Sequence, residues 1–236
     1  CDYNQITSLN VSNNIALTFL SCAANQLSIL DVSNNTALHI LGCPGNQLTI
    51  LDISQNTALN ELSCDSNQLT SLDISQNTAL HTLGCTANQL TSLDVSQNAA
   101  LTELHCQDNN LTTLDLSNNT LLTDLRYQFT GISSIDLSGA ISLTDLRCQH
   151  NQLTSLDISQ NINLLYLDCK YNQLTQLDLR NGNNINMVVV LFDNPDLFCI
   201  NVDDENWSTM NWTNIDSAMF FSANCNPSEI EEQTKN

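Results

Sequence analysis

The sequence has very few basic residues. Only five of its 236 residues are Lys or Arg, whereas 25 are Asp or Glu, and the formal net charge is -20 at pH 7. A surface of this charge repels the phosphates of nucleic acids and the head groups of anionic membranes. We therefore expect no nucleic-acid partner.

Long apolar runs and enzyme motifs are also missing. No stretch approaches the roughly 18 apolar residues that a membrane helix needs, so we expect no membrane insertion. The sequence contains no G-x-S-x-G, H-E-x-x-H, P-loop or G-x-G-x-x-G motif, and we expect neither enzymatic activity nor a cofactor. No signal peptide is present, but the chain starts in mid-repeat, at Cys1, and we expect it to be a fragment.

What the sequence does contain is a 21-residue repeat. Eight full rows run over residues 17–184, and a typical row, residues 59–79, reads LNELSCDSNQLTSLDISQNTA. Its ten-residue half follows L-x-x-L-x-C-x-x-N-Q and its eleven-residue half follows L-T-x-L-D-[VIL]-S-x-N. The alternating apolar residues indicate short extended segments, and no 3.6-residue period indicates helix. Stacked rows would bury columns of Leu and Asn.

These half-rows carry the L-x-x-L-x-L-x-x-N/C-x-L signature of the leucine-rich repeat. The nested 10/11 arrangement resembles the bacterial IRREKO-type subclass over about residues 1–184. The resemblance implies a mostly β solenoid with short parallel strands in a sheet on the concave face. It also implies a second extended ladder on the opposite face and few or no helices in the array.

The repeat pattern weakens from Gly182 onward. Counted by 21, Val190 takes the cysteine position and Pro195 that of the next Leu. We predict a solenoid at 1–184, a non-repeat C-terminal cap at 185–225 and an acidic flexible tail at 226–236. The cap would cover the last apolar rung with Trp207, Trp212, Phe220 and Phe221. It resembles the cap of secreted leucine-rich repeat proteins from Bacteroidetes-type bacteria, which implies an extracellular or cell-surface location.

Most of the ten cysteines lie in one phase of the repeat. Neighbouring coils lie about 4.8 Å apart, whereas a disulfide needs Cβ atoms at roughly 3.8 Å. A straight column also lacks the three or four convergent ligands of a metal site. We therefore predict buried free thiols in the column. Cys199 and Cys225 lie outside it, in the cap, and are predicted to form a disulfide, which would indicate an oxidising compartment.

An Asp column runs through the second half-rows from Asp31 to Asp178. Its mutual repulsion, about 1 kcal/mol per neighbouring pair in water, must be offset. One explanation is hydrogen bonds from nearby hydroxyl or backbone groups. The other is Ca²⁺ bound along the row or in the cap, with the candidate ligands Asp94, Asp115, Asp136, Asp203 and Asp204.

The first half-rows differ most between residues 101 and 171. In leucine-rich repeat geometry their non-Leu side chains project from the concave sheet, and they include Arg, Tyr and amide groups typical of recognition surfaces. The alternative is that the charges only neutralise one another as surface ion pairs. The predicted ligand-binding residues are Glu103, His105, Asp124, Arg126, Gln128, Phe129, Asp145, Arg147, His150, Tyr166, Lys170 and Tyr171.

One row in this region departs from the repeat. Tyr127 takes the cysteine position, Thr130 the Asn position, and Gly139 and Ala140 replace the second polar pair. A Tyr is larger than a site shaped for Cys, so we expect the strand to bulge or widen here and Phe129 to turn outward.

These features predict an extracellular or cell-surface recognition and adhesion module, expected to be a monomer, with a protein or polysaccharide ligand. One alternative is a structural spacer or surface stalk, stiffened by cations along the Asp column. Another is a cytoplasmic scaffold, which would suit the free thiols.

Overall fold

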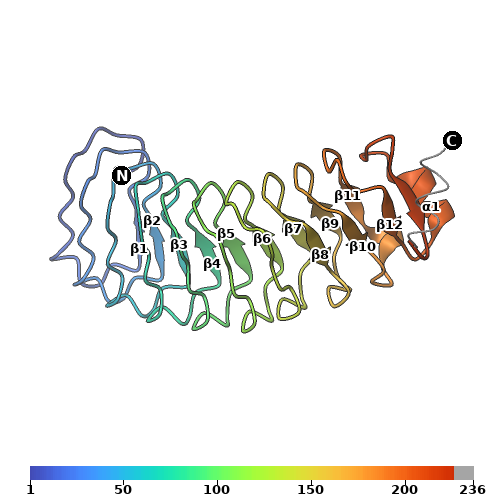
Figure 1. The fold of residues 1–236 in the computed structure, drawn as a ribbon. Coiled ribbons are helices and arrows are strands. Elements are labelled where there is room, and N and C mark those ends of the chain that lie inside the picture. Colours follow the sequence, from blue (N-terminus) through green and yellow to red (C-terminus); the bar gives the residue numbers. More distant parts are fainter. Residues whose placement is uncertain (226–236) are drawn as a thin grey trace.

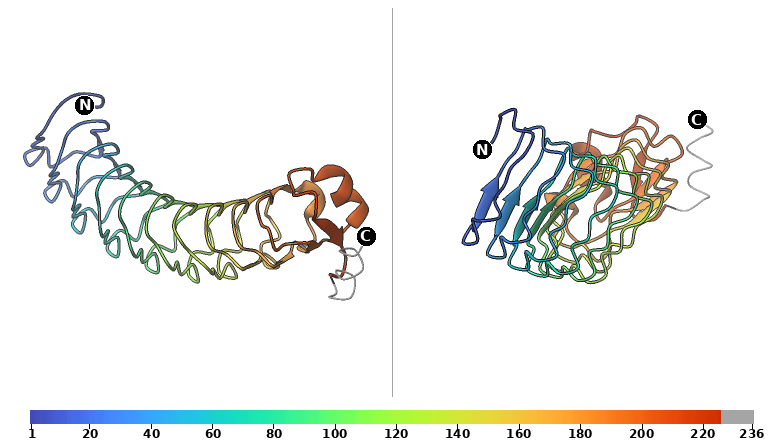
Figure 2. Two further views of the ribbon diagram at one scale, coloured as in Figure 1. Left: turned by 45° about the horizontal axis from the view of Figure 1, so that its top comes forward. Right: turned by 90° about the vertical axis from the view of Figure 1, so that its left-hand side faces the viewer.

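The computed structural model describes residues 1–225, and the predicted tail at 226–236 lies outside the described residues. The chain winds into a curved parallel solenoid in which each 21-residue row forms one coil (Figures 1 and 2). The predicted fold class is confirmed. No helix among residues 1–225 has the length and apolar character needed to cross a membrane.

The main sheet takes one three-residue strand from each coil. It has nine parallel strands; the middle residue of every strand is buried, and in seven of the nine both flanking residues are at least partly exposed. The strands are β1 (Phe19–Ser21), β2 (Ile40–Gly42), β3 (Glu61–Ser63), β4 (Thr82–Gly84), β5 (Glu103–His105), β6 (Asp124–Arg126), β7 (Asp145–Arg147), β9 (Tyr166–Asp168) and β11 (Val188–Val190).

The second half-rows form a regular second sheet only towards the C-terminus. This sheet has four parallel strands in the order β13-β12-β10-β8. They are β8 (Ser155–Asp157), β10 (Gln176–Asp178), β12 (Cys199–Asn201) and β13 (Phe220–Ser222). A 3-10 turn, η1 (Asn184–Asn186), and one helix, α1 (Glu205–Asn211), complete the described chain.

Buried Asn side chains join successive coils. The amide of Asn67 donates to the carbonyl oxygens of Cys43 and Cys64, both at 3.0 Å, and its Oδ1 accepts from the Leu48 N–H at 3.0 Å. The same bonds recur at Asn46, Asn88 and Asn109. Each amide thus pairs main-chain groups that the tight turns would otherwise leave buried and unpaired.

The prediction of a bulge at Tyr127 is wrong. Strand β6 pairs in unbroken register with β5 and β7, and Tyr127 is fully buried in the cysteine position. The larger side chain is accommodated by packing because main-chain bonds on both sides hold the register. Phe129 does turn outward and is 48% exposed.

The assignment of Val190 to the cysteine position is also wrong. Val190 pairs with Asp168, so Leu191, which is fully buried, occupies the position of Cys169 in the next coil. The coil before β11 is therefore one residue longer than the repeat. The extra residue lies in the segment that contains η1, where counting by 21 cannot detect it.

Candidate recognition surface

The predicted binding residues form one strip along the main sheet. Strand pairing aligns Glu103, Asp124, Asp145 and Tyr166 in one row, and His105 with the two Arg in the next. The turn after each strand adds the remaining members. We call this strip the recognition surface: Glu103, His105, Asp124, Arg126, Gln128, Phe129, Asp145, Arg147, His150, Tyr166, Lys170 and Tyr171.

Its cations are paired with carboxylates of the same strand or the next. Arg126 Nη2 lies 2.6 Å from Asp124 Oδ2, and Arg147 Nε lies 2.9 Å from Asp145 Oδ1. Lys170 Nζ lies 3.2 Å from Asp168 Oδ2. These pairs make the centre of the recognition surface nearly neutral, on a chain that is otherwise strongly acidic.

Asp124 is held by two partners. Burial raises the pKa of this carboxyl, but hydrogen bonds and charges from His105 and Arg126 outweigh it and lower the pKa to about 2. His105 Nε2 lies 3.3 Å from Asp124 Oδ2. The sequence predicts the Arg–Asp pairs from their spacing within one strand. It does not predict the contact of His105 with Asp124, because these residues lie on neighbouring strands.

We expect Asp124→Asn to destabilise the fold at neutral pH and less so in acid. Because the folded-state pKa lies below the ordinary value near 3.9, the ionised carboxylate stabilises the fold above pH 4, and this contribution is lost as the pH falls towards 2. Equilibrium urea unfolding should show a deficit of about 1–2 kcal/mol at pH 7 that shrinks below pH 4. Asp108→Asn, at an exposed carboxylate, is the control, and a deficit as large near pH 2 as at pH 7 would contradict the assignment.

Aromatic side chains form a ladder along one border of the strip. The ring of His150 stacks on Phe129 and on Tyr171, with centroids 4.2 Å apart in both pairs and interplanar angles of 13° and 16°. Phe192 meets Tyr171 edge-on at 5.5 Å. We call these residues the aromatic ladder: Phe129, His150, Tyr171 and Phe192.

Three residues of the ladder occupy a left-handed backbone position. Phe129, His150 and Tyr171 have φ values of 56°, 55° and 54°, where earlier coils have Ala24, Gly45, Ser66, Ala87 and Asp108. Bulky side chains are uncommon in this conformation, which is disfavoured for them by about 1–3 kcal/mol. Stacking offsets part of that penalty, and the backbone geometry directs the rings outward.

Two further residues contact the recognition surface but are absent from the predicted set. Asp168 is 3% exposed and pairs with Lys170, and Phe192 extends the aromatic ladder. Lys170 Nζ also lies 5.3 Å from the centre of the Phe192 ring. Counting by 21 aligns Phe192 with Tyr171, but the inserted residue places Asp193 there, with φ 59°.

The fold and this surface can be compared with known proteins. A family model described as LVIVD repeat matches residues 18–43 and 41–66. No curated protein matches the sequence. Among solved structures, the functional domain of InlJ from Listeria monocytogenes, which includes a cysteine ladder, is 31% identical with a TM-score of 0.64. The alignment covers 86% of this chain and 58% of the InlJ chain.

The chain folds as a leucine-rich repeat solenoid. A leucine-rich repeat protein from Leptospira interrogans is 24% identical over 98% of this chain and 68% of its own, with a TM-score of 0.74. The internalin InlF from Listeria monocytogenes is 22% identical over 94% of this chain and 72% of its own, with a TM-score of 0.70. At these identities the two structures support the fold alone.

The Asp column of the leucine-rich repeat solenoid is hydrogen-bonded. In each coil Oδ1 accepts from the backbone N–H two residues on, as in Ser96 to Asp94, Ser117 to Asp115 and Ser138 to Asp136. These bonds, with those from the Ser hydroxyls, lower the pKa of the three carboxyls. The other two candidate ligands have donors as well: Asp203 accepts from Gly182 N–H and Asp204 from Trp207 N–H at the start of α1.

We expect the melting temperature to be indifferent to Ca²⁺. Within residues 1–225 no three His, Cys, Asp or Glu side chains converge as a cation site requires, and the carboxylates already have donors. The melting temperatures measured by differential scanning calorimetry in 2 mM CaCl₂ and in EDTA should agree to within about 1 °C, because a cation that does not bind the folded chain cannot stabilise it. A rise of several degrees with Ca²⁺ would instead support the cation-stiffened spacer.

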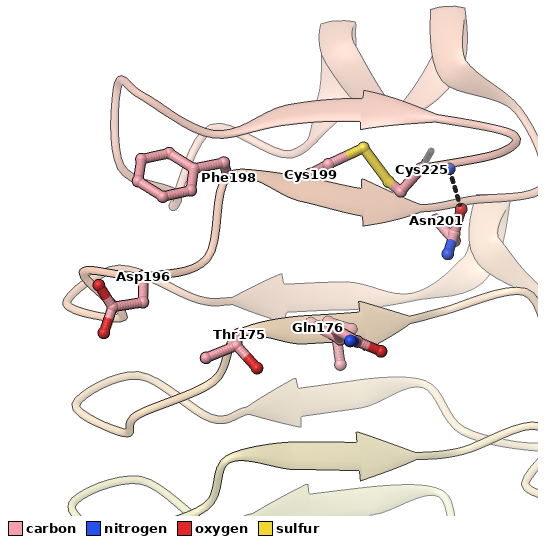
Figure 3. A pocket seen from close by; sticks show the side chains of 8 residues that line it. Thr175, Gln176, Asp196, Phe198, Cys199, Asn201 and Cys225 are labelled. Carbon is pink, nitrogen blue, oxygen red and sulfur yellow. Dashed lines mark hydrogen bonds between the residues drawn. A yellow bond between two sulfur atoms is a disulfide. The ribbon is translucent and has the colours of Figure 1, made fainter. Parts of the chain in front are cut away.

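A disulfide joins Cys199, on β12, to Cys225. A hollow of about 370 Å³ lies beside this bond on the second sheet, lined in part by Thr175, Gln176 and Asn201. Figure 3 shows these side chains and the disulfide. Asn201 Oδ1 accepts from the Cys225 N–H at 2.7 Å. The hollow lies on the second sheet and the recognition surface on the main one, so they are separate features of the solenoid.

Proposed function

We propose that this chain is an extracellular or cell-surface recognition module of a bacterium that binds a protein through the recognition surface. The observation that carries the proposal is the concentration of unusual side chains there. The second half-rows repeat almost unchanged, whereas three of the five basic residues and the aromatic ladder lie within adjacent coils. Repeat solenoids use such extended faces for binding.

A protein ligand suits this surface better than a polysaccharide. Sugars stack on open aromatic faces, but in the ladder His150 covers one face of Phe129 and one face of Tyr171, with ring centroids 4.2 Å apart in both pairs. One face of Tyr166 is covered by the Arg147 guanidinium, 4.8 Å from the ring centre. Arg and Tyr anchors surrounded by carboxylates and amides are typical of protein interfaces.

The cap disulfide supports the location. Disulfides persist in oxidising compartments and are rare in the bacterial cytoplasm. A cytoplasmic scaffold would be expected to keep Cys199 and Cys225 as thiols. We therefore favour a secreted or surface-exposed module over a cytoplasmic one.

The test is a screen of the whole chain against protein and glycan arrays. The variant Arg126→Ala, Arg147→Ala, Tyr166→Ala serves as the comparison, and all three side chains point outward, so it should fold normally. We expect protein hits that the variant loses. Hits confined to glycans would favour a polysaccharide ligand, and hits that both proteins share would contradict the proposed surface.

A further inference from the structure

The aromatic ladder ends beside a carboxylate. The column of left-handed residues reads Asp108, Phe129, His150, Tyr171 and Asp193 in successive coils. Asp108 N–H donates to the Gln128 carbonyl at 3.0 Å, which places its coil directly against that of Phe129. His150 covers one face of the Phe129 ring, and the other face points towards the Asp108 coil, where no further ring continues the ladder among the described residues. Phe129 is 48% exposed and Asp108 is exposed.

The chain builds the same combination of groups twice with its own cations. Arg147 pairs with Asp145 and lies 4.8 Å from the Tyr166 ring of the next coil. Lys170 pairs with Asp168 and lies 5.3 Å from the Phe192 ring, again of the next coil. In both, a carboxylate on one coil and a ring on the following coil hold one cation.

Asp108 and Phe129 form a third carboxylate and ring on consecutive coils. Here no basic residue among residues 1–225 forms an ion pair with Asp108. We propose that an arginine side chain of the protein partner supplies the cation, with its guanidinium stacked on the open face of Phe129 and bonded to Asp108. This inference rests on the proposed function and names the chemistry of the partner's anchor.

Arginine fits this position better than lysine. Its guanidinium is planar, so it can stack on a ring and still direct paired N–H donors at a carboxylate, whereas an ammonium is a strongly hydrated point charge. The net charge of -20 would also draw a basic segment towards the solenoid.

The test uses random hexapeptides displayed on phage, selected on the whole chain and on its variants. Asp108→Asn and Phe129→Ala remove the two halves of the proposed site. Asp94→Asn, at an exposed carboxylate of the second half-rows, is the control. We expect the selected peptides to be enriched in Arg over Lys. Each site variant should bind them about tenfold more weakly, and the control within about twofold of the unchanged chain.

The outcomes separate the two proposals. Peptides that bind the unchanged chain but not the Arg126→Ala, Arg147→Ala, Tyr166→Ala variant, and yet lack Arg or ignore Asp108→Asn, would overturn the arginine site and leave the proposed function standing. Selection of no peptide that depends on the recognition surface would overturn both. Circular dichroism of each variant checks that the fold is unchanged.

Discussion

Replacing Asn88 by Ala lowers the free energy of unfolding by about 3–5 kcal/mol. The Asn88 amide donates to the carbonyl oxygens of Cys64 at 3.1 Å and Cys85 at 3.0 Å, and its Oδ1 accepts from the Leu69 N–H at 3.0 Å. Asn88 is 9% exposed, so water cannot replace these bonds fully. Each buried main-chain group left without a partner is destabilising by about 1–3 kcal/mol, and the substitution leaves several such groups unpaired at once.

Equilibrium urea unfolding followed by circular dichroism measures the change. Gln89→Ala is the matched control, because its side chain is exposed in the next position and its N–H keeps the 2.9 Å bond to the Leu69 carbonyl. The control should change stability by less than about 0.5 kcal/mol. A deficit below 1 kcal/mol for Asn88→Ala would show that the Asn column does not hold the coils together.

The column thiols react with iodoacetamide at least about a hundredfold more slowly than the exposed Cys1 in the folded chain. Burial raises the pKa of Cys22 to about 11 and that of Cys106 to about 12, and it raises the pKa of Cys43, Cys64 and Cys85 as well. Since the thiolate is the nucleophile, a pKa of 12 leaves roughly one group in ten thousand reactive at pH 8, before any steric protection is counted.

Mass spectrometry after timed alkylation gives the result directly. The structure has eight free cysteines, of which Cys1 alone is exposed, and one disulfide. We expect one rapid modification in the native chain, eight in denaturant and ten after reduction. Fewer than eight in denaturant would mean disulfides within the column, and ten without reductant would mean that Cys199 and Cys225 are thiols.

The repeat made most of the fold predictable. A period that returns Leu, Cys and Asn to the same positions in every row leaves few ways to bury them, so the parallel coils and the buried column follow from the pattern alone. The residue inserted before β11 does not follow from the repeat pattern, because it lengthens the coil without changing its composition. The regular strand at Tyr127 does not follow from the pattern for another reason. The main-chain hydrogen bonds to two neighbouring strands hold the register against the larger side chain.

The candidate site was predictable in position but not in detail. Side chains in the same phase of the repeat must lie side by side, which was enough to bring Arg126, Arg147 and Tyr166 onto one strip. The stacking of His150 between Phe129 and Tyr171 depends on a backbone with positive φ. Bulky residues rarely adopt this conformation, so the sequence does not predict it. The contact between His105 and Asp124 depends on rotamers, which a repeat pattern does not determine.

The most direct test of the recognition surface is the dissociation constant of a protein found on the arrays, measured by surface plasmon resonance. The control variant, Gln55→Ala, Gln76→Ala, Gln97→Ala, changes exposed side chains of the second half-rows instead. Arg126→Ala, Arg147→Ala, Tyr166→Ala should raise the Kd by about a hundredfold or more, because Arg and Tyr anchors each contribute about 2 kcal/mol. The control should leave the Kd within about twofold. Equal Kd values for the two variants, with both folded, would contradict the account.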